Sequence, residues 1–196
     1  TPSQVSLDAD CARGPADKSL MYAGLSGEPI EAEATFYNKK STYANGSLAA
    51  HVAVDPGTGQ VEVIQVSSTK DVGRMINPAT LRGQAVGSIV QGLGGTLLEH
   101  LVYDGNCQLL TGSLADYMLP TADDFPNISA TVIELKPAPH IPLGAKGAGE
   151  GEIVPIGGVI ANAVANALAD FGVEPFDLPL SPPRIWQLIQ AARNNA

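Results

Sequence analysis

Apolar and polar residues alternate along two stretches in the first half of the chain, with a turn signal between them. The alternation covers residues 47–54 and 60–66, and Asp55-Pro56-Gly57-Thr58-Gly59 separates them. A period of two is typical of a strand that buries one face, and a segment rich in proline and glycine favours chain reversal. These residues predict an antiparallel hairpin. Similar alternation at 31–37 and 129–136 predicts further strands of a mixed or antiparallel sheet.

Other stretches carry the spacing or the end signals of helices. Asn77-Pro78 predicts a helix start, and apolar residues then recur every four positions, at 85, 89, 93, 97 and 101. A second helix is expected over 156–171, ended by Gly172, and a third over 182–193. Helices packed against such a sheet predict an α+β fold. The side chains that we expect to be buried are Leu97, Val132, Ile160, Val164, Leu168, Ile185 and Leu188.

Composition excludes several classes of partner. The 196 residues are 44% hydrophobic and carry a formal net charge of −9 with a pI near 4.6. A field of this sign repels nucleic acid and anionic membranes, so neither is expected as a general partner. The apolar run 153–168 is short for a bilayer and contains Pro155, Asn162 and Asn166. It predicts a buried helix and no membrane span.

The scattered cysteines and histidines predict no metal site built from side chains. Cys11 and Cys107 match no metal-ligand spacing, and His51, His100 and His140 lie equally far apart. We interpret the cysteines as reduced thiols of a cytoplasmic protein. The chain begins with Thr1 and shows no signal peptide, so we interpret it as a fragment or as a processed or separately encoded subunit.

A glycine-rich segment, Gly144-Ala145-Lys146-Gly147-Ala148-Gly149-Glu150-Gly151, precedes the second expected helix. Glycines allow a ligand to approach the backbone closely, and free N–H groups before a helix favour oxyanions or phosphates. The alternative is a surface loop with a Lys146–Glu150 pair worth less than about 1 kcal/mol. The spacing alone leaves both readings open.

Three segments, in this order, resemble the C-terminal part of the molybdenum-binding subunit of the xanthine dehydrogenase, aldehyde oxidase and carbon monoxide dehydrogenase family. They are residues 71–78 (DVGRMINP), 83–94 (GQAVGSIVQGLG) and 146–150 (KGAGE). Residues 54–61 and 116–120 add to the likeness. The resemblance runs from Tyr37 onward, so we expect an irregular segment at 1–36 and a molybdenum-cofactor-binding domain at 37–196 that forms one half of the cofactor site.

The resemblance implies molybdenum bound through a pterin cofactor, molybdopterin, and leaves open whether the cofactor has its cytosine dinucleotide form. By the same resemblance Glu150 is the general base that takes a proton from the Mo–OH group. Gln84 matches a glutamine at the cofactor, and Ser47 and Leu48 are candidates for the substrate pocket wall. The backbone groups implied in cofactor binding belong to Ile76, Asn77, Ala79, Thr80, Lys146, Gly147, Ala148 and Gly149.

The implied function is that of a molybdenum hydroxylase subunit. Such an enzyme oxidises an aldehyde or hydroxylates an aromatic N-heterocycle with oxygen from water. Family subunits are several times longer, so the resemblance implies that an N-terminal portion supplies the other half of the site. It also implies iron–sulfur and FAD groups on partner subunits or domains. Two alternatives stay open: a non-catalytic scaffold subunit, and a phosphate- or nucleotide-binding module that uses the Gly144–Gly151 loop.

Simpler roles also stay open for single residues. Glu150 could complement a helix dipole, for about 0.3–1 kcal/mol, and Gln84 could be an exposed helical glutamine. Asp71 and Asn77 could only cap turns. Glu152 lies outside the matching motif and is interpreted as a control position for Glu150.

Overall fold

The computed structural model describes residues 40–125 and 127–195. The strand expected at 31–37, the segment 1–36 and Cys11 lie outside the described residues. The strands and helices in chain order are β1 (Asn45–Val54), β2 (Val61–Asp71), α3 (Pro78–Leu97), β3 (Ile128–Ile133), α4 (Ile153–Ala167), η1 (Ala169–Phe171) and α5 (Pro182–Asn195).

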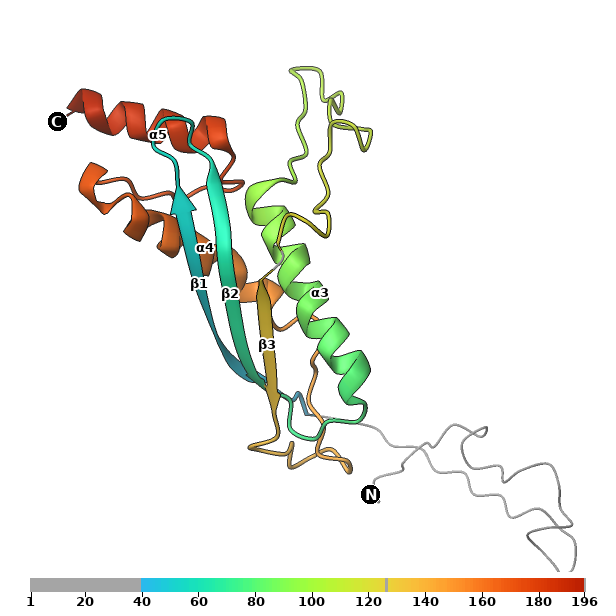
Figure 1. The fold of residues 1–196 in the computed structure, drawn as a ribbon. Coiled ribbons are helices and arrows are strands. Elements are labelled where there is room, and N and C mark those ends of the chain that lie inside the picture. Colours follow the sequence, from blue (N-terminus) through green and yellow to red (C-terminus); the bar gives the residue numbers. More distant parts are fainter. Residues whose placement is uncertain (1–39, 126, 196) are drawn as a thin grey trace, which may run out of the picture. The chain divides into compact units, whose positions relative to one another are not determined.

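The three strands form one mixed sheet in the order β1-β2-β3 (Figure 1). The expected hairpin is confirmed, because β1 and β2 pair antiparallel, whereas β3 pairs parallel to β2. The turn is held by Asp55, whose carboxylate accepts hydrogen bonds from the N–H of Gly57 at 2.8 Å and from Oγ1 of Thr58 at 2.7 Å. The sheet and its helices confirm the α+β prediction.

The end of β3 differs from the expectation. The alternating pattern predicted a strand to residue 136, but β3 ends at Ile133. The N–H groups of Leu135 and Lys136 donate to the carboxylate of Asp71 at 3.2 and 3.1 Å instead of continuing the ladder. A side chain of β2 therefore takes over where the backbone pairing of β3 stops.

Helix α3 begins as predicted and ends earlier. Asn77 is its N-cap, with Pro78 at the first turn. The N–H groups of Leu98 and Glu99 both donate to the carbonyl of Gly94 at 2.8 Å, which closes the last turn at Leu97 instead of residue 101.

Helix α4 starts three residues earlier than expected and is followed by a separate turn. Pro155 does not block the start, because the first-turn N–H groups of a helix have no partner within the helix. The helix ends at Ala167, and η1 forms the rest of the expected segment 156–171. Gly172 closes η1 at φ 65°, as its place in the sequence predicted.

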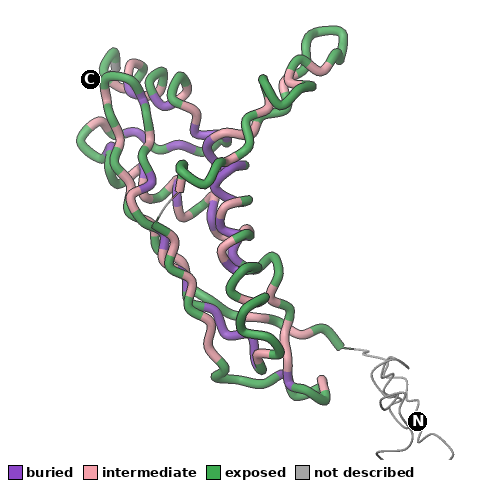
Figure 2. Tube along the Cα trace, turned by 45° about the vertical axis from the view of Figure 1, so that its right-hand side comes forward, coloured by how far each residue is buried: buried purple, intermediate pink, exposed green. Residues whose placement is uncertain are grey.

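The core lies between the sheet and the two helices α3 and α4, which contact each other (Figure 1). Figure 2 shows the exposed segment that follows α3.

Two side chains expected in the core are only half-buried. Val132 lies on β3, which is an edge strand, and Leu188 lies on α5. In the part of the chain that the structure describes, no helix is long and apolar enough to span a bilayer. The other side chains expected in the core are buried: Leu97, Ile160, Val164, Leu168 and Ile185.

Candidate functional site

The C-terminal end of β2 carries two opposite charges side by side, and both are buried. Lys70 is 4% exposed and Asp71 is 7% exposed. Successive residues of a strand point to opposite faces, so the two side chains leave the sheet on different sides. A charged group is buried in a protein only when it is paired or hydrogen-bonded. The glycine-rich loop at 144–152 supplies a partner for each.

Asp71 joins three segments of the chain. Its carboxylate lies 3.1 Å from Nζ of Lys146 and accepts the N–H of Gly73 at 2.9 Å, besides those of Leu135 and Lys136. The N–H of Gly73 and the nearby Lys146 ammonium hold the pKa of Asp71 below its usual range, against the opposing effect of burial. Asp71 therefore does more than cap a turn.

The backbone of the loop is also tied to the end of β2. The N–H of Lys146 donates to the carbonyl of Val72 at 2.8 Å, and Gly73 and Ala145 form an isolated antiparallel bridge. Gly73 has φ 67° and Gly144 has φ 71°, a region that favours glycine. A Cβ at Gly73 would overlap the carbonyl oxygen of Gly144. Both glycines are therefore needed for this close approach.

Lys70 holds the other end of the loop. Its Nζ donates to the carbonyl of Ala148 at 2.9 Å and lies 3.3 Å from Oε2 of Glu152, which also accepts the hydroxyl of Ser88 at 2.9 Å. The side chain of Glu152 is 1% exposed. A Cβ at Gly151 would overlap the Lys70 ammonium, so the loop passes Lys70 as closely as a glycine allows.

A small cavity of about 70 Å³ lies beside this ion pair. Glu152 and Ser68 line it, and Oε1 of Glu152 and Oγ of Ser68 are buried without a hydrogen-bond partner among the described residues. Leu48 lines the same cavity, whereas Ser47 is exposed on β1, opposite Thr69. Liquid water occupies about 30 Å³ per molecule, so the cavity has room for one or two waters.

The middle of the loop faces outward. Gly147, Gly149 and Glu150 are exposed. Within residues 40–125 and 127–195, the N–H groups of Gly147, Ala148 and Gly149 donate no hydrogen bond. Oε1 of Gln84 lies 3.8 Å from where a Cβ of Gly149 would be, so α3 presents this amide to the loop. The structure thus brings together Gln84 and the loop that carries Glu150.

The predicted residues around the start of α3 already serve the helix. Oδ1 of Asn77 accepts the N–H groups of Ala79 at 3.0 Å and Thr80 at 3.3 Å, and Ile76 is exposed. Two of the amides assigned to the cofactor by resemblance are therefore engaged in the N-cap. That they also contact a cofactor stays a prediction.

The spacing of charged residues within the loop did not predict the ion pairs that the structure contains. Lys146 pairs with Asp71 instead of Glu150, and Glu152, interpreted as a control position, is buried in an ion pair with Lys70. Two signals were present in the sequence. Lys70 follows the uncharged stretch 63–69, and Ser88 lies beside Ile89 on the apolar face of α3. Neither signal names its partner, because the partners lie far away in the sequence.

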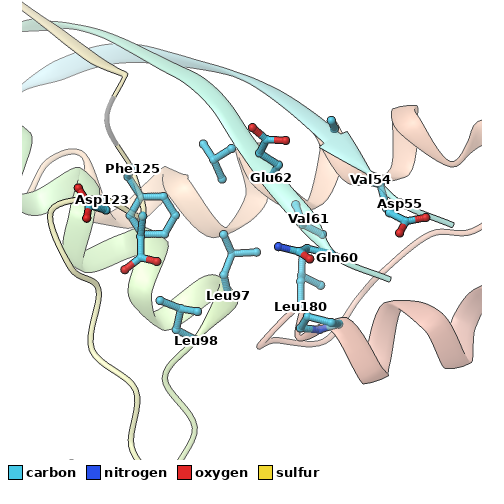
Figure 3. Close-up of a pocket in the computed structure, with 14 residues that line it drawn as sticks. Val54, Asp55, Gln60, Val61, Glu62, Leu97, Leu98, Asp123, Phe125 and Leu180 are labelled. Carbon is cyan, nitrogen blue, oxygen red and sulfur yellow. The ribbon is translucent and has the colours of Figure 1, made fainter. Parts of the chain in front are cut away.

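A larger cavity, of about 660 Å³, lies away from this loop (Figure 3). It is lined by residues at the β1–β2 turn, the end of α3 and the segment before β3, among them Asp55, Glu62, Leu97, Asp123 and Phe125. None of the predicted site residues lines it. Among the described residues, no three histidine, cysteine or acidic side chains gather as a metal site.

Comparison with known proteins identifies a matching family model and relatives that cover most of the chain. The family model of the molybdopterin cofactor-binding domain matches residues 5–126, a range that includes most of segment 1–36 and ends before the glycine loop. The 6-hydroxypseudooxynicotine dehydrogenase complex subunit gamma of Paenarthrobacter nicotinovorans is 39% identical, over 82% of this chain and 20% of the relative. The carbon monoxide dehydrogenase large chain of Hydrogenophaga pseudoflava is 33% identical, over 86% of this chain and 21% of the relative.

A solved structure agrees with these matches. Quinoline 2-oxidoreductase from Pseudomonas putida 86 superposes with a TM-score of 0.78 at 38% identity, over 86% of this chain and 21% of that chain. The chain thus spans about a fifth of the length of the curated relatives it matches. The resemblance first seen in residues 71–78, 83–94 and 146–150 is confirmed: the chain belongs to the molybdopterin cofactor-binding domain family, as do molybdenum-binding large subunits.

Proposed function

We propose that this chain is the C-terminal part of the molybdenum-binding subunit of a hydroxylase, with Glu150 as its general base. The observation that carries the proposal is the build of the glycine loop. Both ends are fixed by buried ion pairs, Asp71–Lys146 and Lys70–Glu152, while its middle is exposed with unbonded amides. Such a loop holds a carboxylate beside a ligand with little freedom to move away.

The residues of the loop fit an oxygen-rich pterin cofactor. The N–H groups of Gly147, Ala148 and Gly149, which have no acceptor in the described part of the chain, can donate to pterin or phosphate oxygens, and the amide of Gln84 adds a further polar group. When bound, the molybdenum–pterin group supplies a two-electron redox centre and a water-derived oxygen. Glu150 would take up, at a carboxylate oxygen, the proton that this chemistry releases. The two ion pairs would keep its carboxylate in reach.

The relatives favour an aromatic N-heterocycle as substrate class. Quinoline 2-oxidoreductase and the 6-hydroxypseudooxynicotine dehydrogenase subunit are 38% and 39% identical to this chain, against 33% for the carbon monoxide dehydrogenase chain. An aldehyde is the alternative substrate. Leu48 beside the small cavity and Ser47 on β1 are the proposed pocket wall.

We also propose partners for the whole protein, which would work in the cytoplasm. The other half of the cofactor site would come from an N-terminal portion, and iron–sulfur and FAD groups from partner subunits or domains. The cofactor would be the cytosine dinucleotide form. One relative is named as a subunit of a complex, which supports this arrangement.

Substitution of Glu150 in the complete, molybdenum-loaded complex tests the proposal. Glu150→Gln keeps the size of the side chain and removes the basic oxygen, so molybdenum content should stay constant while kcat falls by about 10²–10⁴-fold. Glu174→Gln is the matched control, because Glu174 is an exposed glutamate outside the loop. Unchanged turnover in fully loaded Glu150→Gln would refute the role of Glu150 and favour a scaffold subunit. Absence of molybdenum from the native complex would favour a phosphate-binding module.

A further inference from the structure

We propose that Lys70 is a positioning residue that fixes the loop on both sides of Glu150, with the Glu152 carboxylate holding its ammonium group and Ser88 bonded to that carboxylate. The catalytic consequence of this inference rests on the function proposed for Glu150. The effect of Lys70 on the loop itself does not.

The contacts of Lys70 lie symmetrically around Glu150. Its Nζ donates to the carbonyl of Ala148, two residues before Glu150, and pairs with Glu152, two residues after it. Lys70 itself belongs to β2, which pairs with strands on both sides. One ammonium group from a rigid strand therefore sets both flanks of the exposed carboxylate.

Glu152 and Ser88 provide the polar partners of this buried cluster. An unpaired buried ammonium is costly, and the carboxylate of Glu152 compensates its charge. The hydroxyl of Ser88 donates to the same Oε2 atom and orients it. Asp71, the residue next to Lys70, pairs with Lys146 at 3.1 Å, so Glu152 is the carboxylate that compensates Lys70.

The unpaired atoms of this cluster face a cavity that suits water. Oε1 of Glu152 and Oγ of Ser68 lack partners among the described residues, and both residues line the 70 Å³ cavity. A water there would hydrogen-bond both atoms and complete the shell of the carboxylate. We therefore expect a water molecule to complete the hydrogen bonding of Glu152 and Ser68 beneath the loop.

Replacing the Lys70–Glu152 pair by apolar residues distinguishes a positioning role from a purely stabilising one. Apolar residues of similar volume often replace a buried ion pair without loss of stability. They would not replace the hydrogen bond to the Ala148 carbonyl. Stability and loop geometry can therefore be separated by choosing the substitutions.

The first experiment compares Gly151→Ala with Gly158→Ala in the complete, molybdenum-loaded complex. A methyl group at Gly151 overlaps the Lys70 ammonium and displaces it without removing either charge, whereas a Cβ at Gly158 meets nothing within 4 Å. In Gly151→Ala we expect a glutamate-specific protease to cleave the loop at Glu150 about tenfold faster, because the loop would no longer be held on both sides. We also expect kcat to fall by about 10²-fold with KM nearly unchanged. Gly158→Ala should match the unsubstituted protein in all three measurements.

The double variant Lys70→Met with Glu152→Met separates positioning from stability. It removes both charges together, so the thermal midpoint should stay close to that of the unsubstituted protein. Proteolytic cleavage of the loop at Glu150 should nevertheless be as fast as in Gly151→Ala. Unchanged cleavage and unchanged kcat in the double variant would overturn the inference, because the pair would then be replaceable by apolar packing.

Failure of this inference is distinguishable from failure of the proposed function. If Glu150→Gln does not affect turnover but Gly151→Ala speeds cleavage of the loop, Lys70 still positions the loop and only the role of Glu150 is refuted. If cleavage is unchanged in both Gly151→Ala and the double variant, Lys70 does not position the loop, whatever Glu150 does.

Discussion

Replacement of Gly73 by alanine should destabilise the protein far more than the same change at Gly172. Both glycines have positive φ, 67° and 65°, so alanine costs about 1–2 kcal/mol at either position. At Gly172 a Cβ would meet nothing within 4 Å, whereas at Gly73 it would overlap the carbonyl oxygen of Gly144. A backbone atom cannot rotate away, and overpacking of this kind costs about 1–3 kcal/mol more. We therefore expect about 2–5 kcal/mol at Gly73.

The assay is urea unfolding of the purified molybdenum subunit, with both variants measured alongside the unsubstituted protein. The difference between the two losses isolates the contact between β2 and the glycine loop, because the conformational strain is common to both. Gly73→Ala should also lose molybdenum on purification, since the loop would move away from Val72. Equal losses of stability in the two variants, with full molybdenum content, would show that this close approach does not support the site.

Two further changes test neighbouring features. Asn77→Ala removes the side-chain acceptor of the Ala79 and Thr80 amides and should cost about 0.5–2 kcal/mol in urea unfolding; no loss would mean that the cap is dispensable. Because the pKa of Asp71 is lowered in the folded state, its carboxylate contributes stability above about pH 4, and this is lost as the pH falls through the folded-state pKa. The fall in urea midpoint between pH 5 and pH 3 should therefore be smaller in Asp71→Asn than in the unsubstituted protein, and equal falls would refute the sign of this shift.

Local patterns predicted the elements whose causes are local. The hairpin follows from alternation around Asp55-Pro56-Gly57, and the start of α3 follows from Asn77-Pro78, whose side chain and ring act within one turn. The ends of elements were less predictable because other parts of the chain decide them. β3 stops at Ile133 since Asp71, from another strand, takes the next amides. No pattern within residues 129–136 carries that information.

In the candidate site, too, features with local causes were predictable and features that depend on distant residues were not. The glycine loop and Glu150 could be found from sequence, because glycine spacing and the resemblance are both properties of short segments. The ion pairs could not, since Lys70 and Glu152 lie 82 residues apart and Asp71 and Lys146 lie 75 residues apart. Spacing within the loop favoured a Lys146–Glu150 pair, and the folded chain offers Lys146 a nearer, buried acid. Tertiary contact therefore decides which charges remain for chemistry.

This redistribution of charge bears directly on Glu150. From spacing within the loop, Lys146 would be expected to pair with Glu150. In the fold, Asp71 compensates Lys146 at 3.1 Å and Glu152 compensates Lys70 at 3.3 Å, so each cation acts on its surroundings as part of a close pair. The field of such a pair falls off faster with distance than that of a single charge. Glu150 is thereby left exposed on a loop that two cations hold in place without pairing with its carboxylate, as the role proposed for Glu150 requires.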